Sequence, residues 1–210
     1  MTTIALVGNP NSGKTTLFNE LTGTHQRVGN WPGVTVERKT GEFRHGGKPI
    51  AIVDLPGTYT LEPVGDALDE SITRAVITNP DEDLDVLVNV IDASSLARGL
   101  YMTTELLESG RPVVVALNMI DVADAHGVHI DAFRLSQALG VPVVPMVASN
   151  NDGVAALKDA IENVSAASNG LPALPTPEAR YGCVEQLLRD CTRSTPIQDT
   201  VTDRIDSVVV

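Results

Sequence analysis

Eight residues near the amino terminus have the types and spacing of a phosphate-binding loop. The stretch Gly8-Asn9-Pro10-Asn11-Ser12-Gly13-Lys14-Thr15 matches the pattern G-x-x-x-x-G-K-[ST] directly after the apolar run Ile4-Ala5-Leu6-Val7. A strand followed by such a loop and a helix turns several backbone N–H groups toward phosphate oxygens. Four of the eight positions are unconstrained, so a chance match is the alternative. The predicted strand before the loop and the predicted helix after it favour a phosphate site.

The side chains of this loop have separate predicted roles. Lys14 would reach the β- and γ-phosphates of a nucleotide as a point charge, and the Thr15 hydroxyl would occupy one position around an octahedral Mg²⁺. The candidate nucleotide contacts in this stretch are Gly8, Asn9, Pro10, Asn11, Ser12, Gly13, Lys14, Thr15 and Thr16.

A second motif, Asp54-Leu55-Pro56-Gly57, matches D-x-x-G and follows the apolar run Ile50–Val53. Ligands of open α/β sheets bind at the carboxyl ends of the strands, which is where this motif is expected. Asp54 would hold Mg²⁺ through water, and the Gly57 N–H would face the γ-phosphate, so that hydrolysis releases the segment that follows. Alone, such a sequence is also a common turn. Its position after a phosphate loop favours the functional interpretation.

A third motif, Asn118-Met119-Ile120-Asp121, matches N-x-x-D at the end of another apolar run. A carboxylate there can accept two hydrogen bonds from guanine N1–H and its amino group, which adenine cannot offer, so the motif predicts GTP rather than ATP. Met119 stands where such proteins usually have lysine, and would cover the base by packing. Val147-Ala148-Ser149 follows the last predicted strand and could contact the guanine carbonyl through a backbone N–H.

Thr35 lies between the phosphate loop and Asp54, in Gly33-Val34-Thr35-Val36-Glu37. A switch threonine at this place in the order would complete the Mg²⁺ shell, with Gly33 and Val34 beside the nucleotide. The alternative is an ordinary strand threonine. The predicted Mg²⁺ ligands are therefore Thr15, Thr35 and, through water, Asp54.

Composition and charge exclude several other classes of protein. The 210 residues carry a net charge of −12, which disfavours attraction to a nucleic-acid backbone. No run approaches the roughly 18 apolar residues of a membrane span, and the start lacks a signal-peptide pattern, so we expect a cytosolic domain. The two cysteines, Cys183 and Cys191, predict idle thiols rather than a disulfide framework or a metal site.

The elements that must position these motifs alternate between strands and helices. Near-continuous Val, Ile and Leu runs predict buried parallel strands. The segment Glu37–Arg44 is expected to form a hairpin with Pro49–Val53 and so to be antiparallel to it. The predicted strands are Thr3–Val7, Glu37–Arg44, Pro49–Val53, Val86–Ile91, Pro112–Leu117 and Val141–Val144. The predicted helices are Thr15–Leu21, Glu70–Ile77, Ala97–Leu107, Asp131–Leu139 and Val154–Val164. The expected fold is an α/β P-loop GTPase fold, with a mostly parallel six-stranded sheet, one antiparallel strand and helices on both faces.

The last quarter of the chain differs in composition. We expect a G domain over residues 1–165, a linker with several prolines over 166–177, and a short helical segment over 178–210, with a helix at about Glu178 to Thr192.

The chain resembles the N-terminal G domain of the bacterial ferrous-iron transporter B (FeoB) family, within the Ras-like, translation-factor class of GTPases. The resemblance covers roughly residues 1–165. The stretches that carry it are Gly8–Asn19, Gln26–Lys39 and Asp54-Leu55-Pro56-Gly57-Thr58-Tyr59, and the segment Val28–Lys39 is highly specific. It resumes at Ala179-Arg180-Tyr181 and at Thr202-Asp203-Arg204-Ile205-Asp206.

The resemblance implies a cytoplasmic GTPase at the bacterial inner membrane, attached to the membrane-spanning part of an Fe²⁺ transporter, with small Feo accessory proteins as candidate partners and no nucleic acid. It also implies activation by K⁺, with Asn11 and carbonyls around Gly29 and Trp31 completing the shell of the ion. Thr58 stands where many GTPases place a water-orienting glutamine and is too short for that task, so a cation at the phosphates would be useful. The alternative is that Asn11 only shapes the loop.

The implied function is that GTP binding and hydrolysis regulate Fe²⁺ uptake, with Lys14, Thr35, Asn11 and Gly57 as the catalytic groups and switches at about Thr24–Glu37 and Leu55–Leu68. The helical domain that usually follows the G domain in this family would be reduced or absent, because few residues separate Val164 from Arg180, and we therefore expect fast GDP release. The alternatives are a ribosome-assembly GTPase and a signalling switch that scarcely hydrolyses GTP. The oligomeric state stays open.

Overall fold

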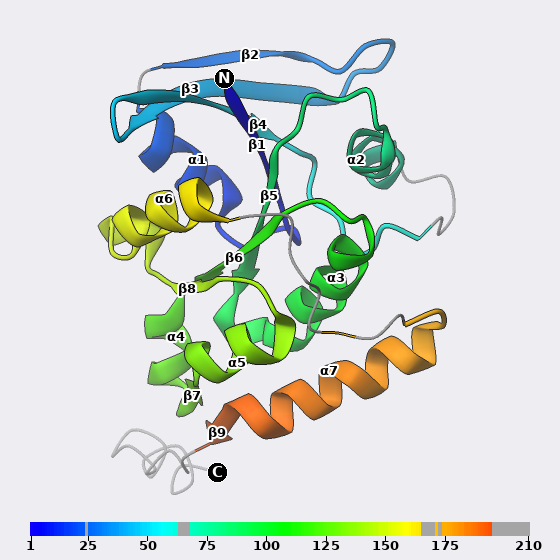
Figure 1. The fold of residues 1–210 in the computed structure, drawn as a ribbon, viewed down its shortest axis with the longest axis vertical. Helices are drawn as coiled ribbons and strands as arrows, with labels where there is room; N and C mark the ends of the chain where they lie inside the picture. The colour runs from blue at the N-terminus through cyan, green and yellow to red at the C-terminus, as the bar shows by residue number, and fades with distance from the viewer. Residues whose placement is uncertain (24, 63–67, 165–170, 172–173, 195–210) are drawn as a thin grey trace, which may run out of the picture.

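The computed structural model describes residues 1–23, 25–62, 68–164, 171 and 174–194. They form a central seven-stranded sheet with helices on both faces and one further helix outside them (Figure 1). The strands are β1 (Thr2–Val7), β2 (Gln26–Asn30), β3 (Glu37–His45), β4 (Lys48–Asp54), β5 (Val86–Asp92), β6 (Val113–Asn118), β7 (Val128–Ile130), β8 (Val143–Pro145) and β9 (Thr192–Ser194). The helices are α1 (Lys14–Thr22), α2 (Leu68–Thr78), α3 (Leu96–Glu108), α4 (Ile120–Ala125), α5 (Ala132–Leu139), α6 (Val154–Asn163) and α7 (Pro177–Cys191), with 3₁₀ turns η1 (Ala93–Ser95) and η2 (Ala148–Asn150).

The strand order is β2-β3-β4-β1-β5-β6-β8, and β3 is the one strand that runs against the others. This confirms the predicted mostly parallel sheet with a single antiparallel strand. The seventh strand, β2, adds to the six that the sequence predicts. All five of its residues are exposed, so it carries none of the apolar signal of a buried strand.

Two cores explain why the central strands are almost wholly apolar. In β1, Ile4 and Leu6 pack against α1 and α6, whereas Ala5 and Val7 pack on the opposite side, with the core of α2, α3 and α5. Both faces of the strand are thus covered, and alternate residues point to alternate cores. Strands β1, β4 and β6 run parallel, so their carboxyl ends lie at the same edge of the sheet.

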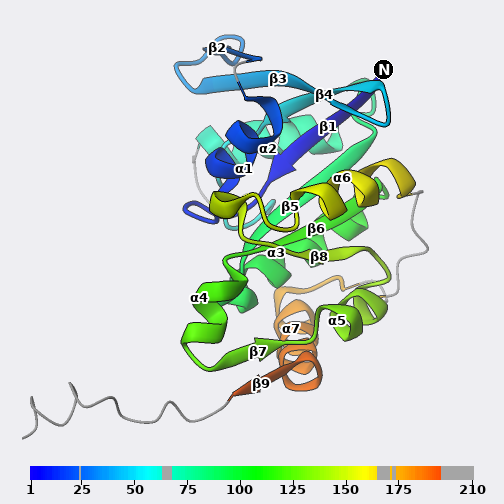
Figure 2. The ribbon, with the colours of Figure 1, turned by 90° about the vertical axis from the view of Figure 1, so that its left-hand side faces the viewer.

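Helix α7 packs against α3 and α5 (Figures 1 and 2), and β9 pairs with β7 in a separate two-stranded sheet. The predicted short helix is present, and Thr176 caps it by accepting a hydrogen bond from the Ala179 N–H. Cys191 is buried, Cys183 is half-buried, and both thiols are free.

Within the described parts of the chain, no helix is long and apolar enough to cross a membrane. Thr24 and residues 63–67 of the predicted switches, most of the predicted linker, and the segment after Ser194 lie outside the described residues.

Candidate functional site

The phosphate loop connects β1 to α1, and its backbone has the conformation that its glycines permit. Gly8 has φ 151° and Gly13 has φ 89°. A Cβ at Gly8 would lie 2.3 Å from the Val90 carbonyl oxygen, and one at Gly13 would lie 2.2 Å from Asn118 Nδ2. Both positions therefore require glycine for space as well as for φ. Asn11 also has a left-handed backbone, with φ 65°, and its side chain lies at the exposed tip of the loop.

Lys14 and Asp54 form the charged centre of the site. Burial lowers the pKa of Lys14, and the charge of Asp54 opposes that shift. Burial likewise raises the pKa of Asp54, against the nearby Lys14. Asp54 Oδ1 is buried and, among the residues described, has no hydrogen-bond partner. An unpaired carboxylate oxygen beside the start of α1, where Thr15 and Thr16 are exposed, fits the outer shell of a Mg²⁺ ion.

The D-x-x-G loop lies directly on the phosphate loop. A Cβ at Gly57 would lie 3.2 Å from both the backbone nitrogen and Cα of Pro10. The Thr58 N–H donates to the Gly8 carbonyl at 3.3 Å, and Asn9 Nδ2 donates to the Thr58 carbonyl at 3.3 Å. Two predicted elements, 49 residues apart in sequence, are thus joined.

The N-x-x-D motif lies on the other side of the same loop. Asn118 Nδ2 donates to the Ser12 carbonyl at 3.0 Å, and Asn118 Oδ1 accepts from the Ala148 N–H at 2.9 Å. Met119, with φ 59°, turns the chain into α4, and its methyl group lies beside Gly13. Asp121 is exposed in the first turn of α4.

In the predicted guanine loop, two of the three backbone N–H groups donate to other parts of the protein. The Val147 N–H donates to the Asp152 carbonyl, and the Ala148 N–H is taken by Asn118. Ser149 is exposed. Its N–H is therefore the amide of the three that remains for a guanine carbonyl.

The first switch lies apart from these groups. Gly29 is in β2 opposite Arg38, and Gly33, Val34 and Thr35 lie in the turn that follows. The turn projects from the sheet edge, away from the loop between β1 and α1 (Figures 1 and 2). No hydrogen bond within the described residues joins Thr35 to Lys14, Thr15 or Asp54.

Trp31 anchors this turn. Its side chain is 7% exposed and belongs to the core that contains Val76 and Leu55, and the Arg38 guanidinium lies 4.7 Å from its ring centre. The Trp31 N–H donates to the Val36 carbonyl at 2.9 Å. No hydrogen bond within the described residues joins Asn11 to Gly29 or Trp31.

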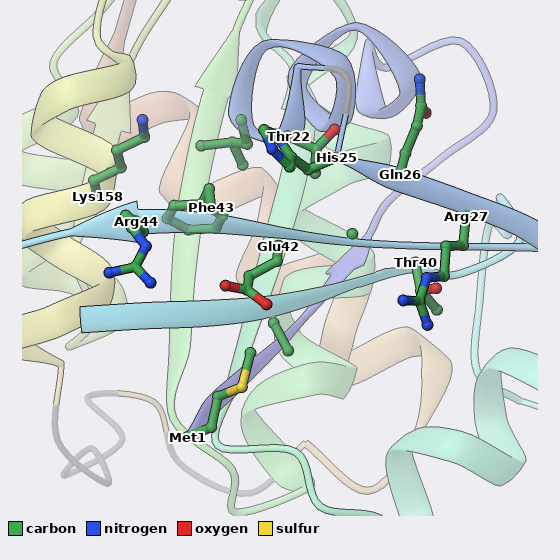
Figure 3. A pocket seen from close by; sticks show the side chains of 13 residues that line it. Met1, Thr22, His25, Gln26, Arg27, Thr40, Glu42, Phe43, Arg44 and Lys158 are labelled. Atoms are coloured by element: carbon green, nitrogen blue, oxygen red, sulfur yellow. The ribbon is translucent and has the colours of Figure 1, made fainter. Parts of the chain in front are cut away.

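A hollow lies elsewhere, at the sheet edge between α1, β3 and α6 (Figure 3). Phe43 and Lys158 lie on one face of β3, whereas Glu42 and Arg44 project from the other (Figure 3). None of the three motifs contributes to it. The hollow is consequently separate from the candidate site.

Strands β1, β4 and β6 deliver the three motifs to one edge of a mostly parallel sheet, which is the organisation of a P-loop G domain of the GTPase class. Comparisons with known proteins agree. The family model described as "Ferrous iron transport protein B" matches residues 2–161. The Fe(2+) transporter FeoB of Salmonella typhimurium is 54% identical over 169 residues, which are 80% of this chain and 22% of that protein.

Solved structures give the same result. The cytosolic domain of L. pneumophila FeoB matches with a TM-score of 0.86 and 37% identity, over 92% of this chain and 100% of that one. The cytosolic domain of T. maritima FeoB in its GMPPNP form matches with a TM-score of 0.81 and 29% identity, over the same shares. The chain belongs to the FeoB family of ferrous iron transport proteins. It spans about a fifth of the length of the curated relatives that it matches.

Proposed function

We propose that this chain binds GTP, hydrolyses it to GDP and phosphate, and thereby regulates Fe²⁺ uptake as the cytoplasmic G domain of an inner-membrane transporter. The observation that carries the proposal is the Asn118 side chain, which ties the phosphate loop to the predicted guanine loop through Ser12 and Ala148. A site for phosphates is thereby held at a fixed position relative to a site for a base. The GMPPNP and GDP forms of T. maritima FeoB support guanine nucleotides as the ligands.

The phosphates would be held by the backbone N–H groups of the loop and by Lys14. Thr15, Thr35 and, through water, Asp54 would hold Mg²⁺, which neutralises phosphate charge. The Gly57 N–H would face the γ-phosphate, because Gly57 packs against Pro10 of the phosphate loop. Thr35 must approach the loop for this arrangement, so the turn after β2 would change conformation on GTP binding.

Guanine would be selected by Asp121, whose carboxylate can accept from N1–H and the amino group, and by the Ser149 N–H. Asn118 fixes both, since it binds η2 and precedes α4. Met119 would cover one face of the base, because its methyl group already lies beside Gly13.

We also propose that K⁺ stimulates hydrolysis. The Thr58 hydroxyl donates to the Thr60 carbonyl at 2.7 Å, which leaves it poorly placed to orient water. Asn11 at the loop tip, with carbonyls of Gly29 and Trp31, would hold the ion. This requires the end of β2 that contains Gly29 to leave its pairing with β3, in addition to the movement of the turn that Thr35 requires.

The experiment is phosphate release by chain 1–210 from GTP and from ATP, with Mg²⁺, in K⁺ and in Na⁺. We expect turnover of GTP, none of ATP, and a higher rate in K⁺. Lys14→Ala should abolish turnover, whereas Lys158→Ala, at the far sheet edge, should not. Equal turnover of ATP would contradict the guanine site. GTP binding without turnover would favour a pure switch.

The role in transport needs the full-length protein. We expect Lys14→Ala in that protein to abolish Fe²⁺ uptake by cells, whereas Lys158→Ala should retain it. Unchanged uptake with Lys14→Ala would separate the G domain from transport, even if GTP turnover is lost.

A further inference from the structure

A buried carboxylate on α3 holds the segment that follows the D-x-x-G motif. Glu105 Oε1 accepts from the Thr60 hydroxyl at 2.5 Å, and Oε2 accepts from the Leu61 N–H at 2.9 Å. Glu105 is only 6% exposed. Two donors, one for each oxygen, form the partner set of a carboxylate rather than of an amide.

The helix that carries Glu105 is itself fixed to the sheet. Asn89 in β5 donates through Nδ2 to Thr103 Oγ1 at 2.8 Å, and Thr103 Oγ1 donates to the Gly99 carbonyl. A Cβ at Gly99 would lie 2.3 Å from Ile91 Cγ2, so α3 lies very close to β5. Glu105 is therefore presented by a rigid element, which suits a positioning role.

Thr58 connects Thr60 to the phosphate loop. The Thr58 hydroxyl donates to the Thr60 carbonyl at 2.7 Å, and the Thr58 N–H donates to Gly8 at 3.3 Å. Thr58 is 1% exposed. Between the two anchors lies the Gly57–Thr58 peptide, whose placement decides where the Gly57 N–H points.

The segment Thr60–Glu62 also contacts α7. Arg180, 7% exposed, donates to Glu108 Oε2 at 2.6 Å and has its Nε 3.8 Å from Glu62 Oε1. Arg74 of α2 donates to the Leu61 carbonyl at 2.5 Å. The segment Thr60–Glu62 is thus held by α2, α3 and α7 together.

We propose that Glu105 is a positioning residue for GTP hydrolysis, which holds Thr60 and Leu61 so that the Gly57–Thr58 peptide stays seated on the phosphate loop. The inference rests on the proposed GTPase function. Glu105 touches neither the phosphate loop nor the predicted guanine loop, so its loss should change turnover and the response of the switch while nucleotide affinity stays the same.

The test compares Glu105→Gln with Glu185→Gln, which removes an exposed carboxylate of α7 whose ion-pair partner is Arg189 of the same helix. We expect Glu105→Gln to lower kcat about tenfold, equivalent to about 1.4 kcal/mol, with the Kd values for GTP and GDP within about twofold of wild type. Glu185→Gln should leave kcat unchanged. Thr60→Val removes the hydroxyl that donates to Glu105 and should lower kcat to a similar extent. The variant that combines Glu105→Gln with Thr60→Val should lose little more, because both changes break the same contact.

A second readout separates this inference from the proposed function. Trp31 is the sole tryptophan and belongs to the same core as Leu61, so its fluorescence reports the first switch and the core beneath it. We expect Glu105→Gln to change the difference in Trp31 emission between GMPPNP and GDP, even in the absence of turnover. Wild-type kcat and emission in both Glu105→Gln and Thr60→Val would overturn the positioning role, whereas no turnover in wild type would overturn the GTPase proposal alone.

Discussion

Asn118 donates a hydrogen bond to the Ser12 carbonyl at 3.0 Å, across 106 residues of sequence. Its other amide atom accepts from Ala148. Asn118 is 3% exposed, so both bonds are sheltered from water. One side chain therefore joins the phosphate loop to the predicted guanine loop.

Asn118→Ala should destabilise the fold and weaken nucleotide binding. It leaves the Ser12 carbonyl and the Ala148 N–H without partners, at about 1–3 kcal/mol each. We expect urea unfolding to show a loss of about 2–6 kcal/mol. Asn118→Asp keeps the acceptor for Ala148 but turns a buried carboxylate oxygen toward the Ser12 carbonyl, so it should lose at least as much stability. Wild-type stability in both variants would contradict the role of these two bonds.

Asp121→Asn should shift the base preference of the site from guanine to xanthine. The amide can donate to the C2 carbonyl of xanthine, which replaces the amino group that the carboxylate would accept from. We expect GTP affinity to fall about 100-fold and XTP affinity to rise, measured by competition against a fluorescent guanine nucleotide. Asp124→Asn, one turn along α4, serves as the control. Unchanged GTP affinity in Asp121→Asn would remove Asp121 from the base site.

Asn11→Gly should remove the stimulation by K⁺. Glycine keeps the left-handed backbone at φ 65°, whereas alanine would add strain of about 1–2 kcal/mol. The comparison of GTP turnover in K⁺ and Na⁺ therefore tests the side chain alone. A variant that K⁺ stimulates as strongly as wild type would show that Asn11 only shapes the loop.

Glu105 should make stability depend on pH. Burial raises its pKa above the usual 4.5, while the bonds from Thr60 and Leu61 and the charge of Arg180 oppose the rise and that of Glu62 adds to it. Because the folded state binds the proton more tightly than the unfolded state, stability is lost as pH rises from 4.5 through the folded pKa. Glu105→Gln should lack this loss. The free energy of unfolding in urea, measured from pH 4 to pH 8, should therefore fall more steeply with pH in the wild type than in Glu105→Gln. The same pH dependence in both proteins would contradict the raised pKa of Glu105.

The sequence predicted the central sheet because its strands are apolar on both faces, as Ile4 to Val7 illustrate. It missed β2, whose residues are exposed, and the pair β7 and β9, which are three residues each and far apart in the chain. Neither has a periodic pattern long enough to detect.

The three nucleotide motifs were visible because close backbone approach demands glycine and specific side chains at fixed spacing. Glu105 and Arg180 were not visible as functional residues. Glu105 lies within a helix where Met102 and Leu106 supply the apolar signal, and its partners are a hydroxyl 45 residues away and a backbone N–H 44 residues away. A charge at such a position reveals its partners only in three dimensions.

The pairing of β9 with β7 has a mechanical consequence. Ser194, the last described residue, is opposite Val128, and His129 Nδ1 lies 2.7 Å from Asp124 Oδ1 of α4. Tension applied at Ser194 would thus pass through a three-residue ladder into the helix that begins beside Asp121. A load on this strand pair would therefore reach the edge of the predicted base site, whereas the phosphate loop follows β1, which pairs with β4 and β5 and takes no part in that ladder.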